Sequence, residues 1–265
     1  MPRLLLALLL CTCLPLSAAQ RVISLAPSLS EIMLELDADD LLVGVLDGGE
    51  RPAALQHLPS VGSYGKLELE TLLSLKPDLI LLWPGSVSTQ QRAQLAGFGI
   101  ALYVGEPHDL QQLASQFEDI GERIGRPQAG RELATRFRQG LQHLREDYRR
   151  APPLPVFYQV WHQPLYTVGG RQIISDALRV CGAENVFADL TLPAPQVGIE
   201  AVLQRDPAVI LGGSDAELDH WQAWPQLAAV RRKQLLRVPD KGLERPSFQM
   251  LVATEKLCQL LANAR

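Results

Sequence analysis

A phrase of 13 residues occurs twice in this chain of 265 residues, at Glu70–Leu82 and again 130 positions later at Glu200–Gly212. Each copy has a Glu, a Leu three residues later, a Pro seven residues later and then an apolar run. This order predicts a short amphipathic helix, a turn at the Pro and a buried strand. The repetition indicates two similar lobes, and the cleft between two lobes is a usual binding site for a small ligand.

The composition describes an ordinary globular chain. Hydrophobic residues make up 47% and charged residues 20% of the sequence, which is enough apolar material to bury a core. The formal charge of -4 lacks the basic excess typical of nucleic-acid-binding proteins, so no nucleic-acid partner is expected. Beyond the first residues no apolar stretch reaches about 18 residues, so the remainder is expected to be soluble.

The first 19 residues have the pattern of a signal peptide. Arg3 precedes the apolar run Leu4–Leu10, and the small residues 17–19 fit a cleavage site after Ala19. This pattern predicts export to the periplasm and a chain that starts at Gln20. A lipid anchor on Cys11 is the alternative, but residues 8–10 lack the small residue usual before a lipidated Cys.

Two cysteines remain after the signal peptide, Cys181 and Cys258. An even pair in an exported protein predicts a disulfide bond, and two buried free thiols are the alternative. The bond would tie a helix of the second lobe to the last helix of the chain. In the chain-entropy model it would stabilise the fold by about 4 kcal/mol.

The order of elements predicts the fold class α/β, with two similar Rossmann-like lobes joined by a single long rigid helix. Strand and helix patterns alternate in both halves, which is typical of parallel sheets covered by helices. Ser28–Glu31 matches a capping box at the start of the first helix. Residues 128–150 predict the long helix, about 35 Å in length. The expected boundaries are residues 20–107 for the first lobe, 108–153 for the helical connector and 154–265 for the second lobe.

Sequence motifs of common enzymes are missing. The chain has no G-x-G-x-x-G, P-loop, G-x-S-x-G or H-E-x-x-H pattern, and its five histidines are scattered without metal-ligand spacing. We therefore expect no catalytic residue, no metal site and no enzymatic activity. An exported two-lobed α/β enzyme, such as a glycosyl-transfer protein, stays open as an alternative.

Four aromatic residues follow or end predicted strands, where ligands meet α/β lobes. They are Tyr64, Trp83, Trp161 and Tyr166, two in each lobe. Flat rings bind flat ligands with a large contact area and little loss of entropy, so we expect these residues at the mouth of the cleft. Packing in the core is the alternative. The loop from Asp240 to Arg245 is expected to add polar contacts, unless it is merely a solvated surface loop.

The chain resembles the vitamin B12-binding proteins that serve ABC importers, within the wider Fe/B12 periplasmic-binding family. The resemblance covers nearly the whole chain after the signal peptide. It is carried by residues 21–27, Ser30, Glu31, Glu70, residues 75–79, Gly169, residues 180–187, residues 195–197, Glu200, Glu244, Arg245, Leu257 and Cys258.

The resemblance implies that cobalamin is held between the lobes by the four aromatic residues and by Asp240, Leu243, Glu244 and Arg245. It also implies that Glu70 and Glu200, one per lobe, dock on arginines of a two-fold-symmetric membrane permease. The alternative role for each Glu is to stabilise the N-terminus of its helix. A monomer is expected, and a haem or ferric-siderophore carrier of the same family stays open.

The family pattern has Trp where this chain has Tyr64, Trp where it has Ala194, and a Tyr near Gly48. The expected cleft is therefore less aromatic than in that pattern, and Trp161 is expected to replace some of the lost contact area.

Overall fold

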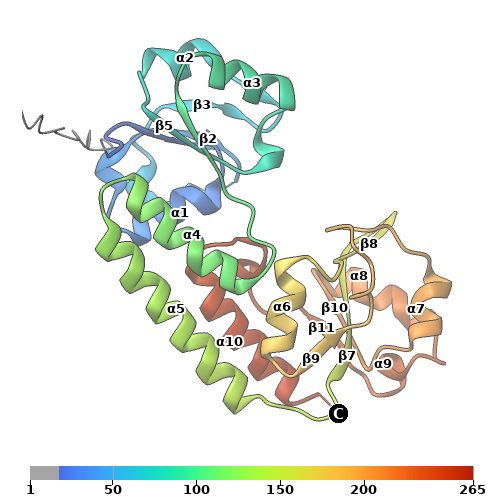
Figure 1. The fold of residues 1–265 in the computed structure, drawn as a ribbon. Coiled ribbons are helices and arrows are strands. Elements are labelled where there is room, and N and C mark those ends of the chain that lie inside the picture. Colours follow the sequence, from blue (N-terminus) through green and yellow to red (C-terminus); the bar gives the residue numbers. More distant parts are fainter. Residues whose placement is uncertain (1–17, 50, 265) are drawn as a thin grey trace, which may run out of the picture.

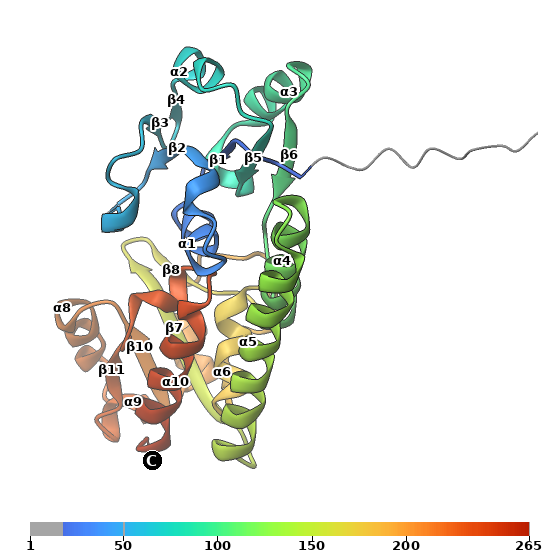
Figure 2. The same ribbon diagram turned by 90° about the vertical axis from the view of Figure 1, so that its left-hand side faces the viewer.

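The computed structural model describes residues 18–49 and 51–264. These residues form two α/β lobes, each built on its own sheet, and a pair of helices beside them (Figures 1 and 2). The expected fold class is thereby confirmed. The expected signal peptide falls almost entirely on residues 1–17, which lie outside the described residues. None of the helices in the described part is both long and apolar enough to cross a membrane.

The first lobe has a six-stranded sheet in the order β4-β3-β2-β1-β5-β6. Neighbouring strands are parallel except β3 and β4, which form an antiparallel pair. The strands are β1 (Val22–Ser24), β2 (Leu42–Asp47), β3 (Ser60–Ser63), β4 (Lys66–Leu67), β5 (Leu79–Leu82) and β6 (Ala101–Val104). The helices are α1 (Pro27–Glu35), α2 (Leu69–Ser74) and α3 (Thr89–Gly97).

The second lobe has a five-stranded sheet centred on β7, which pairs in parallel with β10 and β9 and antiparallel with β8. The strands are β7 (Leu154–His162), β8 (Leu165–Thr167), β9 (Ala183–Asn185), β10 (Val209–Gly212) and β11 (Leu235–Arg237). The helices are α6 (Ile173–Val180), α7 (Ile199–Arg205), α8 (Asp215–Asp219), α9 (Ala228–Arg231) and α10 (Gln249–Ala262).

The repeated phrase folds the same way in both lobes. It forms α2 and β5 in the first lobe and α7 and β10 in the second. The residue six positions after each Glu, Lys76 or Asp206, adopts a left-handed backbone conformation just before the Pro. The residue two positions after each Glu, Leu72 or Val202, is fully buried. This correspondence of backbone and burial fixes Glu70 and Glu200 as equivalent positions.

The connector between the lobes contains the expected long helix, and a shorter helix precedes it. Helix α4 (Leu110–Arg123) leads back along the first lobe, and α5 (Pro127–Asp147) packs on it and continues along the second lobe (Figure 1). The backbones approach closely at Gly121 and Gly130, where an added Cβ would come within 3.0 Å of the partner helix. The connection is therefore a packed helical pair, stiffer than an isolated helix.

A continuous apolar core runs from one lobe to the other through α4 and α5. It includes Ile32 of α1, Phe117 of α4, Phe137 of α5 and Leu257 of α10, all fully buried. Smaller clusters fill the outer faces of the two sheets. Because a change in lobe angle would disturb this shared core, we expect limited closure on a ligand. The boundaries expected at residues 107 and 153 stay a prediction.

One local expectation was wrong. Ser28 does not cap α1, because Pro27 occupies the first turn and Ala26 is the N-cap without a side-chain hydrogen bond. The partner expected for this capping box, Glu31, instead reaches across to the second lobe. The strands β3, β4, β8 and β9 were also not expected, since each is only two to four residues long.

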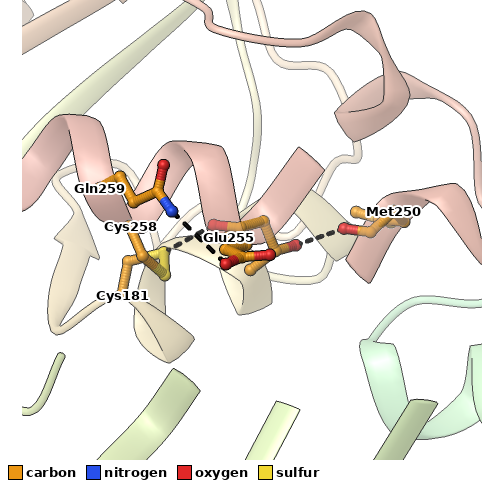
Figure 3. Close-up of a disulfide and its surroundings, with 6 residues drawn as sticks. Cys181, Met250, Glu255, Cys258 and Gln259 are labelled. Carbon is orange, nitrogen blue, oxygen red and sulfur yellow. Dashed lines mark hydrogen bonds between the residues drawn. A yellow bond between two sulfur atoms is a disulfide. The ribbon is translucent and has the colours of Figure 1, made fainter. Parts of the chain in front are cut away.

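Cys181 and Cys258 form a disulfide bond, as the sequence predicted. The bond joins the end of α6 to α10 (Figure 3), and both cysteines are buried. It closes a separation of 77 residues. The C-terminal helix is thereby fixed to the second lobe at the end farthest from α1.

Candidate functional site: a cleft between the lobes

A cleft of about 520 Å³ lies between the two lobes. Its wall comes from three places: the first lobe, the loop that follows β6, and the second lobe. The first-lobe residues are Ala26, Pro27, Ser28, Gly48, Tyr64 and Trp83. The loop after β6 and α4 add Gly105, Glu106, Pro107, His108 and Gln116. The second-lobe residues are Arg171, Gln172, Ile173, Pro193, Lys241, Glu244, Arg245 and Pro246. This volume is in the range of small-molecule sites.

Two half-exposed aromatic rings form the wall of the first lobe. Tyr64 is 48% exposed and Trp83 is 44% exposed. The ring of Trp83 lies against Gly85, where a Cβ would meet it at 1.9 Å, and the ring of Tyr64 lies over Gly48, where a Cβ would meet it at 2.8 Å. Each ring is therefore supported by a position that tolerates no side chain.

Glu244 and Arg245 lie on the second-lobe wall of the cleft. Each is fixed by a hydrogen bond to a residue outside the lining. The hydroxyl of Tyr158 donates to Glu244 Oε1 at 3.4 Å, and burial together with this carboxylate raises the pKa of Tyr158. Arg245 Nη1 donates to Glu31 Oε1 at 2.7 Å. The Glu31 side chain is only 12% exposed and also accepts from Gln249. Arg245 thus lines the cleft while it joins the second lobe to the first.

A second carboxylate of α1 lies in the same contact between lobes. Glu35 Oε2 accepts the backbone N–H of Phe248 at 2.9 Å. Burial raises the pKa of Glu35 to about 7, and the nearby charge of Glu31 adds to the shift, while hydrogen bonds from the 247–249 segment oppose it. Near neutral pH this junction therefore holds a carboxyl that is only partly ionised.

We expect Glu35→Gln to stabilise the protein at pH 8 but not at pH 5. The pKa of Glu35 is raised in the folded state above its ordinary value of 4.5, so its contribution to stability is complete below that value and is lost as the pH rises through about 7. The amide keeps the acceptor for Phe248 and removes the buried charge. Urea unfolding at both pH values should show a gain of about 1 to 3 kcal/mol at pH 8 only. An equal difference at both pH values would contradict this assignment.

The structure brings four of the expected ligand contacts together in the cleft: Tyr64, Trp83, Glu244 and Arg245. The other four lie outside its lining. Trp161 is 54% exposed on the β7–β8 hairpin, where its Nε1 donates to Gln163 O at 3.0 Å, and Tyr166 pairs with it across the hairpin. Leu243 is fully buried. Asp240 caps the following turn through Gly242 and binds Lys256, which lowers its pKa.

Sequence reasoning missed one cationic residue of the cleft, Arg171, and covered another, Lys241, only as part of the loop Asp240–Arg245. Arg171 lies in the loop between β8 and α6, and Lys241 begins the turn that ends at Glu244. Both residues belong to loops near strand ends. Which of these loops face the cleft was not evident from the sequence.

Glu70 and Glu200 lie in the first turns of α2 and α7, and both are exposed. Figure 1 shows α2 at the outer end of the first lobe and α7 on the outer side of the second. Neither carboxylate is in an ion pair within the described part of the chain. Each is available to a partner outside the molecule.

Among the described residues, no group of three or more His, Cys, Asp or Glu side chains is arranged to hold a metal ion. The cleft therefore presents aromatic surface, hydrogen-bonding groups and charge. These features recognise and orient a ligand.

The chain belongs to the periplasmic binding protein family, whose model matches residues 22–241. Among curated proteins it is 35% identical to the vitamin B12-binding protein of Yersinia pestis (strain Pestoides F) over 253 residues, which is 94% of this chain and 89% of that protein. The vitamin B12-binding protein of Yersinia pseudotuberculosis serotype O:3 (strain YPIII) matches with the same identity and coverage. Membership of this family places the protein in the periplasm as a binding protein.

Solved structures agree with this assignment. The periplasmic vitamin B12-binding protein BtuF of Vibrio cholerae superposes with a TM-score of 0.83 and 34% identity, covering 93% of this chain and 98% of that one. The periplasmic haem-binding protein HutB of Vibrio cholerae superposes with a TM-score of 0.79 and 21% identity, covering 91% and 98%. The similarity to HutB extends to the fold alone.

Proposed function

We propose that the protein is a periplasmic carrier that captures cobalamin in the cleft between its lobes and delivers it to an ABC importer. The observation that carries this proposal is the cleft of about 520 Å³ with Tyr64 and Trp83 exposed on one wall. Broad, half-exposed rings suit a large flat macrocycle. The relatives that match nearly the whole chain are named for vitamin B12, which supports the same ligand.

In this function the protein performs no covalent chemistry. The ligand enters and leaves unchanged, a single copy of the chain suffices, and Glu70 and Glu200 contact the permease. The signal peptide would be cleaved after Ala19. The backbone N of Gln20 lies 2.8 Å from Asp78 Oδ2, so a new positive terminus at Gln20 would have an anionic partner, which supports cleavage at this position.

A haem or ferric-siderophore carrier is the second candidate. It is favoured by the cationic side chains of the second-lobe wall, Arg171 and Lys241, which suit carboxylate-bearing ligands. The haem-binding protein HutB has the same fold. Calorimetric titration with cyanocobalamin, haemin and a ferric siderophore separates these functions. One-to-one binding of cyanocobalamin alone is expected, whereas binding of only one of the other two would replace the proposal.

Replacing Trp83 with Ala should weaken cobalamin binding about 30-fold to 150-fold. The ring is half exposed in the empty cleft, and burying the rest of it against a ligand is worth about 2 to 3 kcal/mol. Phe98→Ala is the matched control, because Phe98 is similarly exposed at 48% but lies outside the cleft lining. Calorimetry on both variants checks the prediction, and equal affinities of the two variants would remove Trp83 from the site.

A further inference from the structure

The two walls of the cleft differ in charge. The first-lobe wall presents Tyr64 and Trp83, and no Lys or Arg of the described first lobe belongs to the lining. The second-lobe wall carries three cationic side chains, Arg171, Lys241 and Arg245. A ligand that enters the cleft therefore meets an aromatic surface on one side and positive charge on the other.

Two of the three cations are not neutralised within the described part of the protein. Arg245 is paired with Glu31, but Arg171 and Lys241 take part in no ion pair there, and both are exposed. Two carboxylates also line the cleft, Glu244 on the same wall, which accepts a hydrogen bond from Tyr158, and Glu106 in the loop after β6. Neither forms an ion pair with Arg171 or Lys241 in the described part of the chain. Two cations facing one cavity without a counter-charge of their own attract an anionic group of the ligand.

We propose that Arg171 and Lys241 form an anion subsite of the cleft that binds the phosphodiester of a nucleotide-bearing corrinoid. This inference rests on the proposed function and adds the part of the ligand that the second lobe recognises. A corrinoid with its nucleotide tail carries one negatively charged phosphodiester, whereas the macrocycle carries neutral amides. The aromatic wall takes the macrocycle, and the cationic wall takes the tail.

The subsite predicts selectivity between complete corrinoids and those that lack the nucleotide. Cyanocobalamin has the phosphodiester, and dicyanocobinamide has the same macrocycle without phosphate, ribose and base. A hydrogen bond to a charged group is typically worth 1.5 to 3 kcal/mol, which corresponds to about tenfold to 150-fold in affinity. The double variant Arg171→Gln/Lys241→Gln should therefore weaken cyanocobalamin binding by about that factor. Its affinity for dicyanocobinamide should change less than about twofold.

The experiment measures the affinity of the full chain for cyanocobalamin, dicyanocobinamide and haemin by calorimetry, with melting temperature as a check on folding. The matched control is Arg145→Gln/Lys233→Gln, which removes two exposed cations that lie outside the cleft lining. If the control weakens cyanocobalamin equally, the effect is one of net charge and the subsite is refuted.

If the double variant lost affinity for cyanocobalamin and dicyanocobinamide by the same factor, the subsite would also be refuted. The same holds if it lost affinity for neither corrinoid. Loss for haemin with cyanocobalamin unchanged would show that the two cations bind carboxylates instead of the phosphodiester. Failure of the unsubstituted protein to bind either corrinoid is a different result, because it would remove the proposed function and this inference together.

Discussion

Reversing the charge of both Glu70 and Glu200 to Arg is expected to abolish cobalamin uptake while the affinity for cobalamin stays within about twofold. Both carboxylates are exposed at equivalent positions of a structural repeat, and neither belongs to the lining of the cleft. A permease with two-fold symmetry would offer the same cationic group to each of them. Removing both charge-assisted contacts and creating two repulsive ones costs several kcal/mol, enough to prevent docking.

The readout is uptake of labelled cobalamin by cells whose own binding protein has been deleted and replaced by each variant. Glu132→Arg/Glu255→Arg is the control, because it changes the net charge equally at two other exposed glutamates. Normal transport by the Glu70/Glu200 variant, or equal loss with the control, would show that docking does not depend on the repeated carboxylates.

The second large effect is on stability. Replacing both Cys181 and Cys258 with Ala should lower the free energy of unfolding by about 4 kcal/mol, because the unfolded chain regains the freedom of a long loop. For a chain of this size that corresponds to a fall in melting temperature of roughly 10 °C. The bond lies between α6 and α10 and outside the cleft lining, so cobalamin affinity should be nearly unchanged.

Thermal unfolding monitored by circular dichroism checks this prediction, and the unsubstituted protein with a reducing agent provides an independent comparison. A melting temperature within about 2 °C of the parent would mean that packing of α10 on α5 and α6 alone fixes the C-terminal helix. Loss of binding at unchanged melting temperature would instead point to a role of the bond in the cleft.

The sequence predicted best what depends on local pattern. Both copies of the repeated phrase were recognised as helix, turn and strand. These elements carry their own periodicity and turn residues, and a Pro fixes the turn in each copy of the repeat. The disulfide bond could also be predicted, because only two cysteines remain after the expected signal peptide and two cysteines can pair in only one way.

The features that could not be predicted from the sequence depend on contacts between distant segments. Glu31 looked like the partner of Ser28 in a local capping box, but it bonds to Arg245, more than 200 residues away in the chain. Trp161 was placed correctly near the end of a strand, yet the short strand β8 extends that strand into a hairpin and leaves the ring outside the cleft lining. Lys241 faces the cleft because of how β11 and α10 are arranged around its turn, and no short-range pattern encodes this arrangement.

The proposed function requires that a flat corrin ring lies between the lobes, and a crystal structure of the protein grown with cyanocobalamin tests this directly. We expect the macrocycle in the cleft against Tyr64 and Trp83, with its nucleotide tail toward the second lobe. A corrinoid bound elsewhere on the surface, with these two rings still in contact with solvent, would contradict the account.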